Sequence, residues 1–329
     1  MKKRQDDTAG TGGMGAPRVL ILPASYVASG RTIGGGERYA LEYARALAER
    51  TPTTLALFDE TARTETIGPL EVRTFAKGRF WERWGIPLTR ETWRALAAYD
   101  VVHPMVFPTP VTDFLIASAR LRGQVVVLTD VGGGGPCAST YLQRVHPGAS
   151  LNRRADGLAL LSRHAAGFFA DWPQPRTLLF GGADLDAFGG GGEPGGYALF
   201  VGRLLPHKGV LQVIEALDEE TPLHVVGRPY DPAYLQALRR AAEGKRVEFV
   251  LDADDRELAR QYAGASVVLQ PSLPVAEGQA DTSELLGLVT IEAMASGKPV
   301  IVTRAGSLPE LVVDGTTGYV VAPHDPAAL

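Results

Sequence analysis

The stretch SELLGLVTIEAMASGKP, residues 283–299, decides the fold of the C-terminal part of the chain. Its apolar residues recur at helical spacing over Gly287–Ser296, and the pattern stops at Gly297 and the proline two residues later, which end helices. Glu284 lies just ahead of this expected helix, and Glu292 lies inside it. The first turn of a helix presents unpaired N–H groups and a partial positive charge. We therefore expect an anion-binding helix N-terminus with a carboxylate on either side of it.

A second group of charged residues lies upstream, in the segment VGRLLPHKG at residues 201–209. Arg203 and Lys208 follow the strand pattern Tyr197–Gly202 and stand where the chain turns toward the next helix. Two cations at such a turn can neutralise a diphosphate, and the two carboxylates can accept hydrogen bonds from sugar hydroxyls. Together the two segments indicate a nucleotide-diphosphate sugar as ligand. The alternative is that all four are ordinary surface charges, a helix-start lysine and an ion-paired arginine among them.

Strand patterns alternate with helical patterns along the chain, which predicts parallel sheets built from βαβ units. The strands expected in the first half are Arg18–Ala24, Leu55–Phe58, Val101–His103, Val125–Thr129, Gly157–Leu161 and Thr177–Phe180. Those expected in the second half are Tyr197–Gly202, Leu223–Val226, Val247–Leu251, Val267–Gln270 and Val300–Thr303. The expected helices are Glu37–Arg50, Gly209–Leu217, Pro232–Glu243, Arg256–Tyr262 and Gly287–Ser296.

The run GGGGEPGG at residues 189–196 is the most linker-like segment. It divides the chain into two Rossmann-like, doubly wound parallel-sheet domains of the α/β class, expected over 18–188 and 197–329. A ligand cleft should lie between them, at the carboxyl ends of the strands. Residues 1–17 are polar and glycine-rich, and we expect a disordered tail there.

Composition excludes several classes of protein. The chain has 329 residues, enough for two domains, and a net charge of −4, which gives no reason to expect nucleic-acid binding. Cys137 is the only cysteine, so no intramolecular disulfide forms, which fits a reducing compartment. No signal-peptide pattern is present, and no apolar run approaches the roughly 20 residues that a spanning helix needs. We expect a cytoplasmic protein.

With these motifs in place, the chain resembles glycosyltransferase family 4. The segments that carry the resemblance are an expected glycine turn at Gly34–Gly36, DVVH at 100–103, LSRH at 161–164, FGGAD at 180–184, the Arg203/Lys208 segment, the Glu284–Glu292 motif, PVIVT at 299–303, PELV at 309–312 and DGTTG at 314–318. Their order and spacing are more specific than any one of them. The resemblance implies the GT-B fold and a hexosyltransferase-type enzyme. Such an enzyme moves a sugar from a nucleotide-diphosphate sugar to a sugar, lipid-linked or small-molecule acceptor, with retained configuration and no metal or other cofactor.

The resemblance also implies roles for particular residues. Arg203 and Lys208 would neutralise the diphosphate as the glycosidic bond breaks. Glu284 would bind hydroxyls of the donor sugar, and Glu292 the ribose diol. The remaining contacts to the nucleotide would come from backbone at Gly35, Gly36, Gly287, Leu288 and Val289.

The sequence departs from the family in the first domain. The segment VLTDVG at residues 127–132 resembles one that normally carries a histidine two residues after the threonine, but Val131 stands there. Asp130 could contact the donor sugar instead, and His103, at the end of its own strand, could point into the same cleft. The alternative for either residue is a purely structural role.

The segment Lys77–Arg94 interleaves arginines with three of the four tryptophans. Such aromatic and basic segments can lie at a membrane interface, so peripheral contact with the membrane is one interpretation. The alternative, which we favour, is that the aromatic residues pack on the first domain or line the acceptor pocket.

The chain ends at Leu329, where the family normally continues through further helices, the last of which crosses back to the first domain. We therefore expect either a truncated or a short variant, in which the crossing helix is missing. Two other functions stay open: a sugar-nucleotide epimerase, and a non-catalytic nucleotide-sugar-binding protein. A nicotinamide dehydrogenase is disfavoured because no Gly-x-Gly-x-x-Gly follows the first strand.

Overall fold

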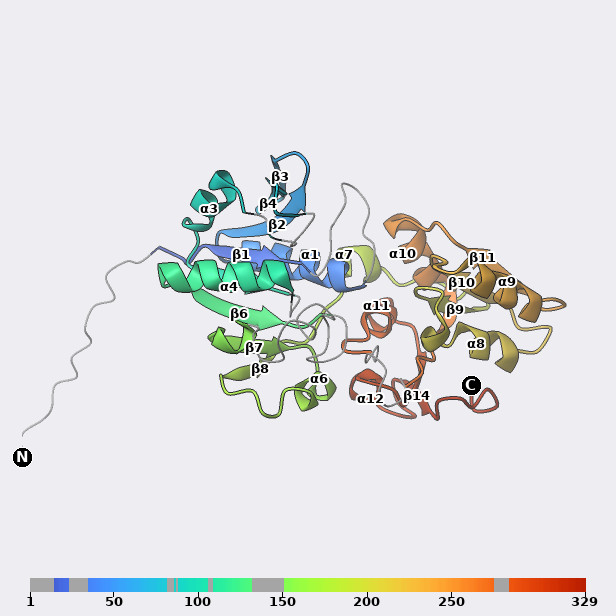
Figure 1. Ribbon diagram of the computed structural model, residues 1–329. Coiled ribbons are helices and arrows are strands. Elements are labelled where there is room, and N and C mark those ends of the chain that lie inside the picture. The colour runs from blue at the N-terminus through green and yellow to red at the C-terminus, as the bar shows by residue number, and fades with distance from the viewer. Residues whose placement is uncertain are drawn as a thin grey trace, which may run out of the picture.

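Two sheets flanked by helices form two side-by-side domains in the computed structural model (Figure 1). The structure describes residues 15–23, 35–81, 86, 88–105, 109–131, 151–274 and 284–329. Residues 1–14 of the predicted tail therefore lie outside the described residues. No helix within the described ranges is both long enough and apolar enough to cross a bilayer.

The first domain is built on an eight-stranded sheet of order β3-β4-β2-β1-β5-β6-β7-β8. Its strands are β1 Val19–Leu22, β2 Thr53–Asp59, β3 Arg63–Ile67, β4 Leu70–Ala76, β5 Val101–Pro104, β6 Val125–Thr129, β7 Gly157–Leu160 and β8 Arg176–Leu178. Its helices are α1 Gly35–Ala48, α3 Arg90–Leu96, α4 Pro110–Arg122, the 3-10 turn η1 Leu151–Arg154, and α6 Arg163–Gly167. All neighbouring strands are parallel except β3, which pairs antiparallel with β4.

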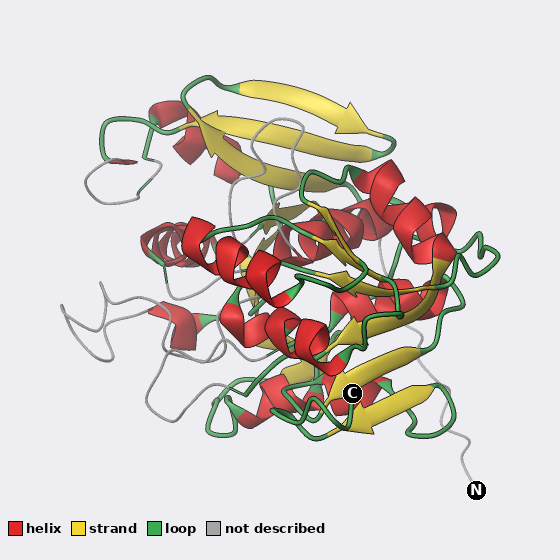
Figure 2. Ribbon diagram, turned by 90° about the vertical axis from the view of Figure 1, so that its right-hand side faces the viewer, coloured by secondary structure: helices red, strands yellow, loops and turns green. Residues whose placement is uncertain are grey.

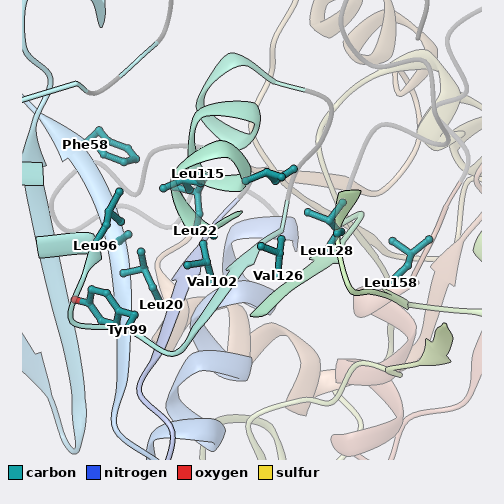
Figure 3. Packing of buried hydrophobic residues seen from close by; sticks show 14 of the residues in the cluster. Leu20, Leu22, Phe58, Leu96, Tyr99, Val102, Leu115, Val126, Leu128 and Leu158 are labelled. Carbon is teal, nitrogen blue, oxygen red and sulfur yellow. The ribbon is translucent and has the colours of Figure 1, made fainter. Parts of the chain in front are cut away.

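The first domain has a core on each face of this sheet, because alternate residues of a strand point to opposite sides. Leu20 and Leu22 of β1 pack with Leu115 of α4, in the cluster that Figure 3 shows. Val19 and Ile21 pack on the other face, against α1. Helices thus cover both sides of the strands, as Figure 2 shows, and this leaves the carboxyl ends of the strands at one edge for a site.

The second domain has a six-stranded parallel sheet of order β11-β10-β9-β12-β13-β14. Its strands are β9 Tyr197–Val201, β10 Leu223–Val226, β11 Val247–Val250, β12 Ala265–Gln270, β13 Val300–Thr303 and β14 Gly318–Val321. Its helices are the 3-10 turn η2 Pro206–Lys208, α8 Val210–Ala216, α9 Pro232–Ala241, α10 Asp255–Gly264, α11 Leu288–Ala295 and α12 Leu308–Leu311. The short α7, Leu185–Phe188, precedes β9 and places Phe188 in this domain's core.

Every strand expected from the sequence is present, and the two-domain α/β prediction is confirmed. The prediction missed the β3–β4 hairpin and β14. The reason is plain for β3, whose residues RTETI are polar and mostly exposed at the sheet edge, so that no buried apolar pattern marks the strand.

Candidate active site

Lys208 and Glu284, predicted from separate motifs, meet in the structure. The Nζ atom of Lys208 lies 2.6 Å from Oε2 of Glu284, and the two side chains are only 17% and 15% exposed. Lys208 reaches this position because β9 runs into η2 and the chain then turns at Gly209, where φ is 74°. A Cβ at Gly209 would lie 2.0 Å from the carbonyl oxygen of Pro271, so only glycine fits this turn.

The carboxylate of Glu284 is held in its ionised form. Burial alone would raise its pKa, but the charge of Lys208 and hydrogen bonds from Lys208, Ser272 and Gln270 outweigh burial and lower the pKa below the ordinary value. The backbone around Glu284 is fixed as well, because its carbonyl oxygen accepts a hydrogen bond from the Ser307 N–H at 2.8 Å. The ionised carboxylate of Glu284 therefore lies next to the fixed ammonium group of Lys208.

The N-terminus of α11 lies directly after this pair. Gly287 is the N-cap, with a φ of 72°, and has no side chain with which to cap the helix. One amide of the first turn is occupied, since Thr290 donates its N–H to Oε1 of Gln270 at 3.1 Å. The amides of Leu288 and Val289 come before it, where a helix has no internal acceptor. The predicted helix N-terminus is thus present, and its binding of an anion stays a prediction.

Glu292 is buried deeper than the first carboxylate, with 3% of the residue exposed. The Tyr262 hydroxyl donates to its Oε2 at 2.9 Å, and Nη1 of Arg38 lies 3.7 Å from its Oε1. Burial raises the pKa of Glu292 to about 7, although Arg38 and Tyr262 act in the opposite direction. At neutral pH this carboxyl group is therefore poised between its two charge states.

Arg38 belongs to α1 of the first domain, so its contact with Glu292 crosses between the domains. Its other terminal nitrogen, Nη2, forms an ion pair with Asp255 at the start of α10. These residues line a cavity of about 240 Å³ whose other charged lining groups are Glu42, Arg45 and Asp184.

Apolar contacts also join the domains beside the N-terminus of α11. Leu286 and Leu288, which flank Gly287, pack into the first domain's core cluster on the α1 side of its sheet. Leu286 fits against Gly181, where a Cβ would lie 2.6 Å from its Cδ1. Figure 1 shows α11 on the side of the second domain that faces the first.

Glu310 makes a further contact between the domains. It belongs to α12, and its two carboxylate oxygens accept the N–H groups of Arg163 and His164 at 2.8 and 2.6 Å. These amides belong to the first turn of α6, so a residue of the second domain satisfies a helix terminus of the first.

The glycine segment differs from its prediction. The sequence predicts a turn at Gly34–Gly36, but Gly35 and Gly36 form the start of α1, and Gly34 lies outside the described residues. A Cβ at Gly36 would lie 3.3 Å from the Val131 carbonyl oxygen, which is a tight contact, whereas one at Gly35 would make only ordinary contact with Leu288 at 3.9 Å. The contact of these two glycines with a nucleotide stays a prediction.

His103 does not point into the cleft, so that interpretation was wrong. It lies on the α1 side of the central strand β5, with Nε2 at 2.7 Å from the Thr129 hydroxyl and its ring against Tyr43. Burial lowers its pKa to about 4, which makes it a neutral structural residue. Asp130 directly follows β6 and is also buried, and its role in donor binding stays a prediction.

The surroundings of Arg203 support its predicted role less than those of Lys208 do. Arg203 is exposed just after β9, with its guanidinium carbon 5.9 Å from the centre of the Tyr230 ring. Its contact with a diphosphate stays a prediction.

The aromatic and basic segment packs in part on the first domain. Trp81 lies against Phe58, with ring centres 5.4 Å apart, and joins the edge of the α4-side core. Trp93 is 37% exposed, and the guanidinium carbon of Arg122 lies 3.9 Å from the centre of its ring. For Trp81 the packing interpretation is therefore confirmed.

Sequence reasoning missed the residues that join the domains. Arg38 lies two residues after the glycine run, and Glu310 lies within the PELV motif, but nothing in either segment indicates a partner in the other domain. Tyr262 was expected only as the last residue of a helix.

Comparisons with known proteins agree with this architecture. Residues 190–329 match the family "Glycosyl transferases group 1". The D-inositol 3-phosphate glycosyltransferase of Streptomyces scabiei is 31% identical over 278 residues, which are 75% of this chain and 54% of that protein. The D-inositol 3-phosphate glycosyltransferase 2 of Catenulispora acidiphila is 36% identical over 272 residues, 74% of this chain and 56% of that protein. The chain spans about half the length of these curated relatives.

Solved structures extend the likeness to both domains. Anabaena Alr3699/HepE in complex with UDP and glucose superposes with a TM-score of 0.68 at 18% identity, over 95% of this chain and 87% of that one. Sucrose-phosphate synthase from Thermosynechococcus elongatus gives a TM-score of 0.69 at 21% identity, with the same coverage of 95% and 87%. These likenesses show the GT-B fold. With this fold, residues 190–329 match the group 1 glycosyl transferases, and the likenesses support the family 4 type that the motifs of the chain resemble.

Proposed function

We propose that the chain transfers a sugar from a nucleotide-diphosphate sugar to an acceptor hydroxyl, with retained anomeric configuration and without a metal ion. One observation carries the proposal: the Lys208–Glu284 pair, 2.6 Å apart, lies beside the uncapped N-terminus of α11. A cation and a helix terminus suit a diphosphate, and an ionised carboxylate suits sugar hydroxyls.

In this proposal the positive groups stabilise the leaving nucleotide. As the bond from the sugar to the diphosphate breaks, negative charge grows on the diphosphate oxygens. Lys208 is held in place by Glu284, and the amides of Leu288 and Val289 are fixed by the helix, so little reorganisation is needed when the charge develops. Arg203 is the second cation that we assign to the diphosphate.

Glu284 and Glu292 orient the donor. Glu284 is ionised and accepts hydrogen bonds from hydroxyls of the transferred sugar, and Glu292 accepts them from the ribose diol. Attack and departure on one face of the sugar would retain its configuration. The competing scheme is a covalent glycosyl ester on Asp130, which requires the acceptor to displace that carboxylate in a second step.

A donor screen tests the proposal. The UDP complex of the HepE neighbour makes UDP sugars the first donors to try, followed by GDP and ADP sugars. We expect transfer to an acceptor in the presence of a chelator, and proton NMR of the first-formed product should show the coupling constant of the retained anomer. Inversion, or a chelator block that magnesium relieves, would refute the corresponding part of the mechanism.

Variants of Lys208, with a matched control, test whether this residue takes part in sugar transfer. Lys208→Ala should lower kcat by about 100-fold or more, as loss of a preorganised charge-stabilising group does, and Lys208→Arg should lower it less. Arg239→Ala, an exposed change on α9, is the control and should leave kcat unchanged. Sugar-nucleotide conversion without any acceptor would favour an epimerase, and binding without turnover over a broad acceptor panel would favour a non-catalytic protein.

Peripheral contact with a membrane through Lys77–Arg94 also remains a proposal. The partly exposed Trp93 and its neighbour Arg122 support it. Flotation with anionic vesicles should recover the wild type and lose Trp93→Ala. Equal recovery of the two proteins would count against this contact.

A further inference from the structure

Helix α1 extends one cationic side chain into the second domain. Arg38 is 19% exposed, and its two terminal nitrogens contact different acids there: Nη2 pairs with Asp255, and Nη1 lies 3.7 Å from Oε1 of Glu292. The guanidinium also lies over the Phe188 ring, with its central carbon 5.8 Å from the ring centre. Arg38 is thus held between α7, α10 and α11, and it lines the interdomain cavity.

The charged and polar groups around Glu292 make this contact significant. Glu292 faces two groups of α10, the Tyr262 hydroxyl and the carboxylate of Asp255, and one group of α1, the guanidinium of Arg38. The other charged groups lining the cavity are Glu42, Arg45 and Asp184, and Arg45 is paired with the other two. Among the charged groups of the described structure that face Glu292, Arg38 is the cation, and it comes from the other domain.

We infer that Arg38 is a positioning residue: it reaches from the first domain to hold Glu292 as the carboxylate that receives the ribose of the donor. The ribose site is then complete only while the two domains are closed on each other. The inference rests on the proposed function for the ribose, and it adds a residue of the first domain to the nucleoside site.

The ionisation of Glu292 matters because a diol donates hydrogen bonds and needs an acceptor for them. A carboxylate offers lone pairs on both oxygens, whereas a protonated carboxyl group donates from one of them and binds a diol less well. Burial favours the protonated form of Glu292, and the guanidinium charge opposes it. Without Arg38, Glu292 would be protonated over a wider range of pH, and donor affinity would fall in that range.

Donor affinity as a function of pH tests this. Calorimetry would follow UDP-glucose, GDP-mannose and ADP-glucose, whose diphosphates carry no group that titrates near neutrality. In the wild type, the affinity should fall about tenfold per pH unit below a midpoint near the Glu292 pKa of about 7. In Arg38→Gln the midpoint should rise by about one pH unit or more, so the variant binds far more weakly at pH 7 and recovers part of its affinity at higher pH.

Two further variants separate this role from a structural one. Arg45→Gln removes a cation from the same helix and the same cavity, one whose partners are Glu42 and Asp184, and it should keep the wild-type midpoint. Glu292→Gln should bind weakly at every pH, with no midpoint. An equal loss of affinity at all pH values in Arg38→Gln would overturn the inference.

The protein without nucleotide gives a second readout. The infrared band of a protonated carboxyl group, assigned to Glu292 by its loss in Glu292→Gln, should titrate at higher pH in Arg38→Gln than in the wild type. An unmoved band overturns the inference whatever the nucleotides do. If the wild type binds none of the three sugar nucleotides, the proposed function and the ribose role fail, and the band still decides whether Arg38 controls the ionisation of Glu292.

Discussion

Replacing Lys208 by methionine should destabilise the second domain in a way that depends on pH. The change keeps the aliphatic length of the side chain but removes the cation that lies 2.6 Å from Glu284. In the wild type the lowered pKa of Glu284 contributes stability above the ordinary carboxyl pKa, and that stability is lost as pH falls through the lowered value. In the variant, burial is opposed only by the hydrogen bonds from Ser272 and Gln270 and should raise the pKa of Glu284 instead, so acid should relieve part of the damage.

The magnitude follows from the burial of the pair. Removing one partner of a fully buried ion pair costs about 3–5 kcal/mol. The Lys208 and Glu284 side chains are 17% and 15% exposed, so we expect a smaller loss, about 2–3 kcal/mol at pH 8. Below the raised pKa the deficit should shrink by about 1.4 kcal/mol per pH unit. A second change, Glu284→Gln, removes the stranded charge and should restore about 1–2 kcal/mol.

The distribution of tryptophans makes the assay specific to a domain. Trp81, Trp84, Trp93 and Trp172 are the only four, and all lie in the sequence of the first domain. Denaturant unfolding followed by tryptophan fluorescence therefore reports the first domain, and far-UV circular dichroism reports both. The variant should shift the dichroism transition before the fluorescence transition. A loss of stability of the same size at pH 5 and pH 8, or no recovery in the double variant, would refute the reasoning.

Three further predictions use other contacts. Glu310→Gln removes the charge that caps α6 and should cost about 1 kcal/mol, seen as a melting temperature lower by about 2–4 °C; an unchanged melting temperature would mean that water replaces the cap. His103 has a pKa of about 4, so its native form resists protonation, and stability should fall as pH drops from its ordinary value of 6.5 toward 4. Between pH 6.5 and 5 this loss is about 2 kcal/mol, and His103→Gln should remove it from the acid denaturation profile. Gly209→Ala should cost more than about 1 kcal/mol in urea unfolding because its Cβ would overlap the Pro271 carbonyl oxygen, and an unchanged midpoint would contradict this.

The fold was predictable where a strand is buried on both faces. Val125–Thr129 and Val300–Thr303 have the bounds that the sequence predicts, because continuous β-branched and apolar runs are typical of central parallel strands. Leu223–Val226 also has its predicted bounds, although it contains one polar residue, His224. The β3 strand was missed because its edge position needs no apolar residues, so its pairing depends on β4 alone.

The site was predictable within the second domain only. Lys208 and Glu284 belong to motifs whose order indicates their roles, and they do meet. The contacts of Arg38 and Glu310 depend on how one domain lies on the other, and no local pattern encodes a partner in a separate domain. His103 was misassigned for a related reason, since the end of a strand can face either the cleft or a covering helix.

The position of Leu286 and Leu288 has a consequence for exchanging parts between related proteins. These leucines belong to the sequence of the second domain, yet their side chains complete the core of the first domain. A chimera that takes its second domain from a relative would also import two foreign apolar side chains into the first domain. Such exchanges should therefore succeed when the relative has leucine-sized residues at these two positions and the first domain keeps Gly181, against which Leu286 packs. Otherwise the chimera would have a badly packed first domain.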